Sequence, residues 1–152
     1  MLVFKHIMVP VDGSEHANRA VEIASDLAKK DNTQFMLLHV LTRTGSYDVP
    51  KELRSYAEIE HIRITEKDLV ELAGKEILSN AANRAREHGA IDTSSRLESG
   101  DPASRIAAIA RENGVDLIVM GRRGLGDLGG LLFGSVSHKV AQAVECCCLT
   151  VK

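Results

Sequence analysis

The sequence predicts an α/β fold in which one parallel β-sheet lies between two layers of helices, a three-layer sandwich. Five short apolar runs alternate with four segments of helical periodicity along the chain. Most of these runs are nearly continuous in apolar residues, which is typical of parallel strands covered on both faces. The length of 152 residues suits a single domain with one core. We therefore expect residues 1–152 to form one domain with right-handed crossovers.

The first third of the chain predicts two strands and a helix. The run Ile7–Val11 reads as a buried strand and is followed by a turn at residues 12–14. Apolar residues then recur at helical spacing from Ala17 to Ala28. A second strand is expected at Phe35–Leu41, and residues 42–60 are expected to be mostly loop, with a helical turn after Pro50.

A long helix is expected over residues 65–88. Thr65 and Asp68 have the spacing of a capping box at its start, and Gly89 suits its end. Gly74 lies in the interior of this helix, where glycine weakens the prediction.

The last third predicts three strands and two helices. Thr93–Ser99 is polar for a strand, which favours a position at the edge of the sheet. Asp101 and Pro102 suit the N-cap and first position of the next helix. The remaining expected elements are a strand at Val115–Met120, a helix at Ser135–Glu145 and a strand at Leu149–Val151.

Composition excludes several kinds of partner. The net charge of −2 and the pI near 6.3 argue against a nucleic-acid binder or a binder of anionic membranes, since both need a basic face. No apolar run has the length of a membrane span and no secretory signal is evident, so we expect a cytoplasmic protein. The only cysteines, Cys146–Cys148, are consecutive and cannot readily bond one another; we expect small apolar residues leading into the last strand.

The most informative segment is a glycine-rich loop, with six glycines from Gly121 to Gly134 after a strand and before a helix. Glycine lets backbone N–H groups approach a ligand, and a helix N-terminus favours an anion, most often phosphate. A dinucleotide fingerprint at residues 124–129 lies too late in the chain, and the Walker spacing at residues 129–134 is followed by Ser135 in place of lysine. The third pattern, Gly121-x2-Gly124-x9-Gly134-Ser135, agrees with its surroundings.

This third pattern resembles the G-x2-G-x9-G-[S/T] motif of universal stress proteins of the ATP-binding type. The likeness extends over nearly the whole chain, through residues 9–14, 38–40, 100–102 and 116–121. It implies a Rossmann-like fold of the adenine nucleotide alpha hydrolase type with strand order 3-2-1-4-5. Relatives usually carry a proline before the last strand, where this chain has Cys146–Cys148.

The resemblance also implies an ATP site, with Mg or Mn bound through the phosphates. Asp12 would approach the ribose or adenine, and the backbone of Val40 would meet the adenine edge; capping of the first helix is the structural alternative for Asp12. Arg122 and Arg123 could shield phosphate charge or be ordinary exposed loop residues. The full expected set comprises Pro10, Val11, Asp12, Val40, Met120, Gly121, Arg123, Gly124, Gly134, Ser135, Val136 and Ser137.

No residue set in the sequence resembles efficient catalytic machinery, because a Walker lysine, an acidic pair and an oriented base are all missing. We therefore expect a nucleotide-dependent switch or sensor with slow or no hydrolysis. An enzyme using ATP on the same scaffold, as a slow ATPase or in nucleotidyl transfer, is the alternative, and a phospho-acceptor receiver is a weaker one. A homodimer through the edge strand Leu149–Val151 is expected, since an open edge invites pairing, and the resemblance supports it.

Overall fold

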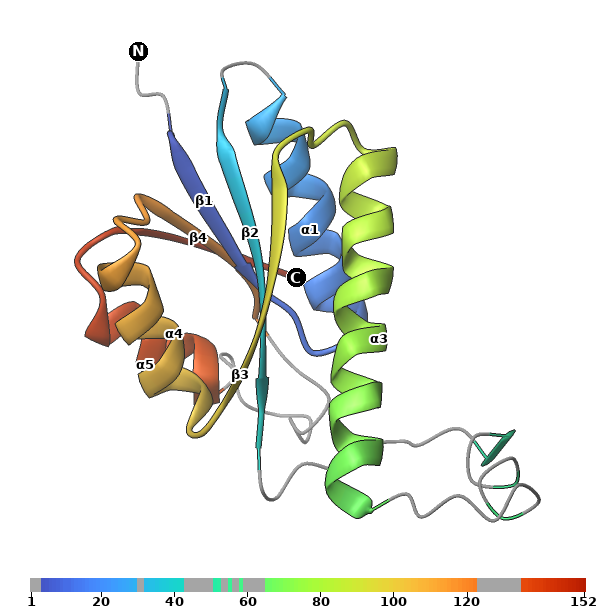
Figure 1. The fold of residues 1–152 in the computed structure, drawn as a ribbon. Coiled ribbons are helices and arrows are strands. Elements are labelled where there is room, and N and C mark those ends of the chain that lie inside the picture. Colours follow the sequence, from blue (N-terminus) through green and yellow to red (C-terminus); the bar gives the residue numbers. More distant parts are fainter. Residues whose placement is uncertain are drawn as a thin grey trace.

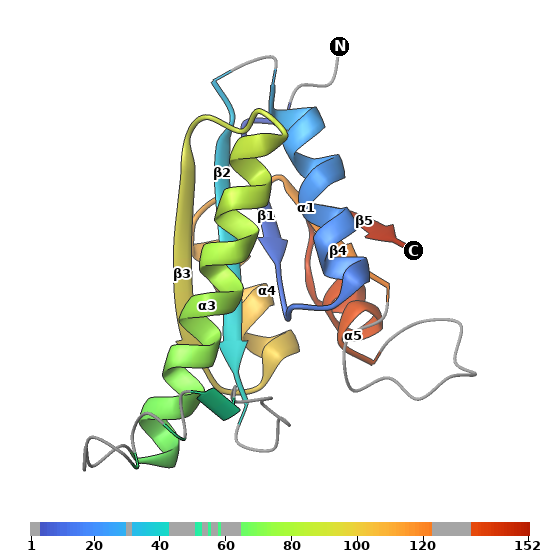
Figure 2. The same cartoon turned by 90° about the vertical axis from the view of Figure 1, so that its right-hand side faces the viewer.

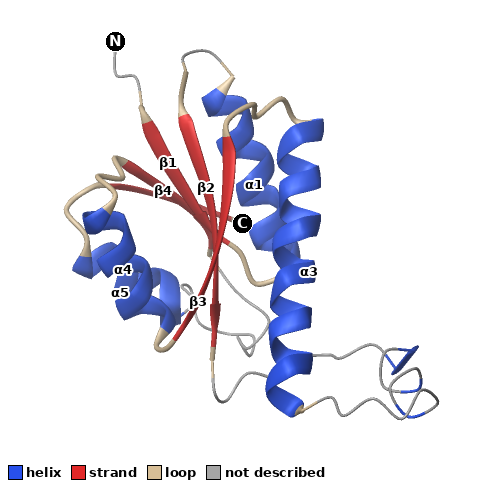
Figure 3. Cartoon of the chain, viewed as in Figure 1, coloured by secondary structure: helices blue, strands red, loops and turns tan. Residues whose placement is uncertain are grey.

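The computed structural model describes residues 4–29, 32–42, 65–122 and 135–152, together with Lys51, Glu52, Ser55 and Glu58. Strands and helices alternate along the chain (Figures 1 and 3). The strands are β1 (His6–Pro10), β2 (Gln34–Leu41), β3 (Thr93–Ser99), β4 (Leu117–Gly121) and β5 (Cys147–Val151). The helices are α1 (Glu15–Ala28), α3 (Glu66–Glu87), α4 (Pro102–Glu112) and α5 (Ser135–Ala143).

The five strands form one sheet in the order β3-β2-β1-β4-β5, and all four neighbouring pairs are parallel. The expected strand order is therefore confirmed. The order reverses between β1 and β4, where Ile7 lies opposite Leu117 and Met8 opposite Ile118. In sheets of this kind, ligands bind beyond the carboxyl ends of the strands at such a reversal.

Helices cover both faces of the sheet and complete the expected three layers. Helices α1 and α3 lie side by side on one face, and α4 and α5 cover the other (Figures 1 and 2). Each face has its own apolar cluster. One contains Val9, Phe35 and Val119 beneath α1 and α3, and the other contains Met8 and Ile118 beneath α4 and α5. No helix in the described part of the chain is both long and apolar enough to span a membrane.

Capping side chains define the starts of three helices. Thr65 and Asp68 form the complete capping box expected at the start of α3. Asp101 caps α4 by accepting a hydrogen bond from the Ser104 N–H at 2.9 Å, with Pro102 at the first helical position. Helix α1 begins at the cap Ser14, whose hydroxyl accepts a hydrogen bond from the Ala17 N–H. These side chains satisfy donors that each helix leaves unpaired.

Strand β3 has the predicted bounds, β1 and β2 each begin one residue earlier than predicted, and β4 and β5 differ by more. Strand β4 starts two residues later than expected, because the Val115 N–H donates to the Ala110 carbonyl and so belongs to the end of α4. It extends to Gly121, which pairs with Val151. Strand β5 starts at Cys147 rather than at Leu149, because residues 147 and 148 pair with the first two residues of β4.

The cysteines lie at the start of β5 and are all free thiols. Cys146 and Cys148 are half-buried against the cluster beneath α4 and α5, as expected for small apolar residues. Cys147 is exposed, which differs from that expectation. Strand alternation explains the difference, because Cys147 and Cys148 point to opposite faces of the sheet.

Candidate functional site

The carboxyl ends of β1 and β4 bring together two segments that are far apart in the sequence. The turn at residues 11–14 follows β1, and Gly121 ends β4 with Arg122 directly after it. Because β1 and β4 are paired neighbours, both segments emerge at the same edge of the sheet. The start of α5 joins them through a hydrogen bond to Arg122. The expected site therefore lies at the reversal of strand order.

The turn after β1 is held by side-chain and backbone hydrogen bonds. The Asp12 carboxylate accepts a hydrogen bond from the Ser14 N–H at 2.9 Å, and Gly13 has a φ of +85°. Such a bond between an aspartate and the residue two positions on is an Asx turn. Ser14, not Asp12, is the residue that caps α1. Asp12 thus shapes the approach to the helix while its side chain stays partly exposed.

Gly121 lies against the first turn of α1 with almost no space. A Cβ at this position would lie 2.8 Å from the His16 Cβ and 2.9 Å from the Ala17 backbone nitrogen. Real Cβ atoms essentially never make contacts this short, and the neighbouring atoms are mostly backbone that cannot turn aside. Close packing therefore requires glycine here, independently of any ligand. This packing fixes the end of β4 against the start of α1.

The start of α5 is anchored to the end of β4. The Ser137 hydroxyl is buried and donates a hydrogen bond to the Arg122 carbonyl oxygen at 3.1 Å. The Arg122 N–H in turn donates to the Val151 carbonyl at 2.7 Å. Ser135 begins the helix and is exposed, and the first N–H groups of α5 have no partner within the helix itself.

Three apolar residues at the carboxyl ends of adjacent strands share the face covered by α4 and α5. Val40 and Met120 are the next-to-last residues of β2 and β4, and both belong to the cluster beneath those helices. Pro10 lies between them at the end of β1, on the same face by strand alternation. Val136, in the first turn of α5, packs against the same cluster. The strand residues Pro10, Val40 and Met120 thus form an apolar wall on this face, at the carboxyl ends of their strands.

Val11 points to the opposite face. Its side chain is 5% exposed and belongs to the cluster beneath α1 and α3. Its N–H donates to the Leu38 carbonyl at 2.8 Å, and its carbonyl accepts from His39. Both backbone groups of Val11 are thus engaged within the protein.

His39 lies beneath the turn as a buried residue. Its Nδ1 lies 2.6 Å from the Val11 carbonyl oxygen, and its side chain is packed near Gly74 of α3. Burial lowers the pKa of His39, although the hydrogen bond to Val11 acts in the opposite direction. A neutral imidazole therefore ties β2 to the turn after β1.

The structure places most of the expected site residues at this end of the sheet. Those described there are Pro10, Val11, Asp12, Val40, Met120, Gly121, Ser135, Val136 and Ser137. Arg123, Gly124 and Gly134 lie outside the described residues, so the motif is represented by its first glycine and its serine. Among the described residues, no group of three or more His, Cys, Asp or Glu side chains is placed to hold a metal ion.

The sheet has helices on both faces, and a polar turn and a helix N-terminus lie where its strand order reverses. These features are typical of the doubly wound class of α/β domains. Comparisons with known proteins give the family. The model of the universal stress protein family matches residues 4–152. The chain is 35% identical to the universal stress protein YxiE of Bacillus subtilis over 158 residues, covering 99% of this chain and 100% of the relative. The chain belongs to the universal stress protein family.

Solved structures agree with this assignment. The protein MJ0577 superposes with a TM-score of 0.76 at 28% identity, covering 99% of this chain and 97% of its own. A universal stress protein crystallised in complex with cAMP superposes with a TM-score of 0.68 at 27% identity, covering 99% of this chain and 98% of its own. The fold and the family are thus supported by both sequence and structure.

Proposed function

We propose that this chain is an ATP-binding universal stress protein that acts as a nucleotide-dependent switch or sensor, with slow or no hydrolysis. The observation that carries the proposal is the meeting of the Asp12 turn, the end of β4 and the start of α5 at one edge of the sheet. The relative crystallised with cAMP supports an adenine nucleotide as the ligand class. We propose ATP rather than cAMP or AMP because Gly121-x2-Gly124-x9-Gly134-Ser135 resembles the motif of the ATP-binding type.

Each part of the site suits a different part of the nucleotide. The wall of Pro10, Val40 and Met120 offers apolar contact to a purine, which agrees with the low aromatic content of 3%. In this proposal the Asp12 carboxylate accepts hydrogen bonds from a ribose. The N-terminus of α5 at Ser135 offers N–H groups and a favourable dipole for phosphate oxygens.

A divalent cation fits this site only as a partner of the phosphates. Asp12 is the carboxylate at the turn, and it already accepts a hydrogen bond from the Ser14 N–H. Mg²⁺ commonly binds through one or two carboxylates plus substrate phosphates. We therefore propose that Mg or Mn, when present, is held mainly by phosphate oxygens and supplies countercharge. In this proposal Arg122 and Arg123, which directly follow Gly121 in the sequence, add further countercharge.

The test uses the double variant Gly134→Asp, Ser135→Ala. The aspartate adds negative charge where phosphate is expected, and the alanine removes a hydroxyl at the start of α5. ATP binding measured by calorimetry should fall below detection, while circular dichroism stays that of the wild type. Ser79→Ala, an exposed serine on α3, is the matched control. Wild-type ATP affinity in the folded double variant would refute the site.

Turnover separates the switch from the alternative enzyme. Purified protein mixed with excess ATP should release less than one equivalent of phosphate over the time of an ordinary assay, and no adenylate should form. Multiple turnover lost in the double variant would favour the enzyme. Mass spectrometry of small molecules released from denatured protein would identify the resident nucleotide.

We also propose a homodimer through β5. Both β5 and β3 are edge strands, but β3 carries Arg96 and Glu98, joined at 2.6 Å, whereas β5 has no charged residue. Charged side chains protect an edge against pairing. Leu149 in β5 is also 38% exposed, which is unusual for a large apolar residue of a sheet. The β5 edge is therefore the better place for a second copy to pair.

The oligomeric state tests this part of the proposal. Sedimentation of the wild type at tens of micromolar should give the mass of a dimer, and Leu149→Lys should give a monomer. Ser95→Lys at the opposite edge is the matched control and should leave the dimer intact. A monomeric wild type would contradict the proposal, as would equal effects of the two lysines.

A further inference from the structure

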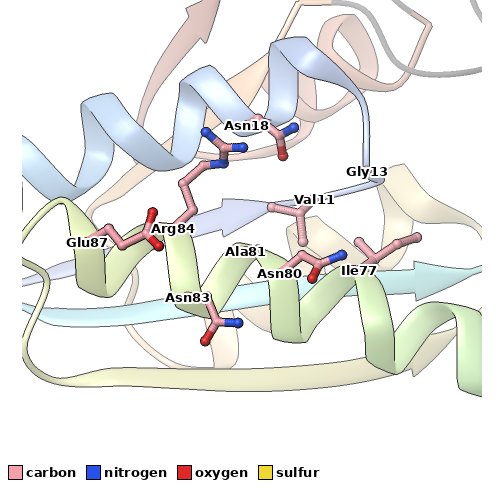
Figure 4. A pocket seen from close by; sticks show the side chains of 9 residues that line it. All are labelled: Val11, Gly13, Asn18, Ile77, Asn80, Ala81, Asn83, Arg84 and Glu87. Carbon is pink, nitrogen blue, oxygen red and sulfur yellow. The ribbon is translucent and has the colours of Figure 1, made fainter.

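A groove of about 330 Å³ lies between α1 and α3, on the opposite face of the sheet from the wall of Pro10, Val40 and Met120. Figure 4 shows the nine residues that line it. Asn18 comes from α1, and Val11 and Gly13 come from the turn after β1. The α3 residues are Ile77, Asn80, Ala81, Asn83, Arg84 and Glu87. Its volume is at the lower end of the roughly 300–1,000 Å³ typical of small-molecule sites.

Two of the amides in this groove have capacity for a ligand. In the described part of the chain, the side chains of Asn18 and Asn80 make no hydrogen bond to another residue, whereas the Asn83 oxygen accepts one from Arg86. Asn18 and Asn80 face the groove from opposite helices (Figure 4). Each primary amide offers two donor hydrogens and one acceptor oxygen. A ligand between them would need both donors and acceptors.

The charges of the groove argue for an uncharged ligand. Arg84 lines the groove with its guanidinium, which also donates to the Glu22 carboxylate at 2.6 Å, so a positive charge is held in this wall. Glu87, one turn further along α3, adds a carboxylate that accepts hydrogen bonds. An anion would meet Glu87, and a cation would meet Arg84. Hydroxyl groups avoid both conflicts, because they donate to carboxylates and accept from amides and guanidinium.

The floor of the groove is apolar. Val11 and Ala81 are buried, and Ile77 packs against the same cluster beneath α1 and α3. A ring with hydroxyls at its rim and C–H groups on its face would match this floor and these walls. We propose that the groove binds a small uncharged polyol of monosaccharide size. This proposal does not depend on nucleotide binding, because the groove lies on the other face of the sheet.

The test is titration of the full-length protein with myo-inositol, glucose and ribose, followed by amide chemical shifts in NMR spectra. At least one of the three should give saturable shifts that cluster on α1 and α3. Acetate and ethylammonium serve as charged probes and should bind more weakly than the best polyol. The absence of saturable shifts with all three polyols, or tighter binding of either charged probe, would overturn the proposal.

Substitution then assigns the site. Asn80→Leu and Asn18→Leu keep side-chain size while removing the amides, and each should weaken binding by about fivefold to tenfold. Gln142→Leu, an exposed amide on α5, is the matched control and should leave the affinity unchanged. Circular dichroism confirms that each variant is folded. Wild-type affinity in both asparagine variants, or an equal loss in the control, would show that the groove is not the site.

Discussion

Gly121→Ala should destabilise the protein, because the added methyl has no room at the start of α1. The new Cβ would lie 2.8 Å from the His16 Cβ and 2.9 Å from both the Ala17 nitrogen and the His16 carbonyl carbon. Two of these three atoms belong to backbone, which can move only if β4 and α1 separate. The φ of Gly121 is not among the positive values of the described residues, so backbone strain adds nothing.

The size of the effect follows from this geometry. Overpacking a well-packed interior costs about 1–3 kcal/mol. For a domain of this length, each kcal/mol lowers the melting temperature by about 2–4 °C, so Gly121→Ala should lower it by about 2–12 °C. Urea unfolding should show a lower midpoint with an unchanged slope.

Gly74→Ala is the informative comparison. A Cβ there would lie 2.8 Å from the Leu41 Cδ2 and 3.0 Å from the Leu97 Cδ1, which are the ends of flexible side chains, and 3.1 Å from the His39 Cδ2. The alanine also favours the helix by about 0.8–1.0 kcal/mol over glycine. The two effects oppose each other, so the net change should be smaller than that of Gly121→Ala. A Gly121→Ala variant as stable as the wild type, or less affected than Gly74→Ala, would refute this reasoning.

Three further measurements test other parts of the structure. Burial lowers the pKa of His39, so as the pH falls the unfolded chain takes up the proton before the folded protein does. The free energy of unfolding should therefore have its full value above pH 6.5 and decrease below it. In urea titrations between pH 5 and 7.5, His39→Gln should remove this contribution to the pH dependence. Ser14→Ala removes the cap of α1 and should cost about 1 kcal/mol in the same assay, whereas Ser14→Asp should restore most of it. Burial raises the pKa of the Cys148 thiol to about 11, so at pH 8 the exposed Cys147 should react first with a thiol reagent; peptide mapping that finds Cys148 modified first would contradict the described exposures.

Much of the fold could be predicted from local patterns. The continuous apolar runs of β1 and β2, the Thr65 and Asp68 box and the Asp101-Pro102 pair all act through neighbours in the sequence. The ends of β4 and β5 were missed because they depend on each other, with Leu117 pairing Cys147 across the sheet. The adjacency of β1 and β4 required the family resemblance, because no local pattern states which strands are neighbours.

The site was predicted less completely than the fold. The sequence singled out Asp12 and Gly121, but it did not show that Ser14 is the cap or that Gly121 is required by its contact with α1. The contact between Gly121 and His16 joins residues more than a hundred positions apart, so no local pattern reveals it. The groove beneath Asn18 and Asn80 was also missed. The sequence of α3 does show polar residues beside the buried Ala81. These residues form the wall of a groove only because α1 packs next to them, and the sequence of α3 alone does not reveal that packing.

If copies pair through β5 as proposed, the unequal borders of the sheet limit how far this chain can assemble. One border bears an arginine and a glutamate, and the other bears no charge. A symmetric dimer through β5 would bury the β5 edge of both copies. Only the two β3 edges, which carry the charged residues, would then stay open. Under the proposed pairing, growth would stop at two copies, because no second uncharged border would remain for a fibre to extend from.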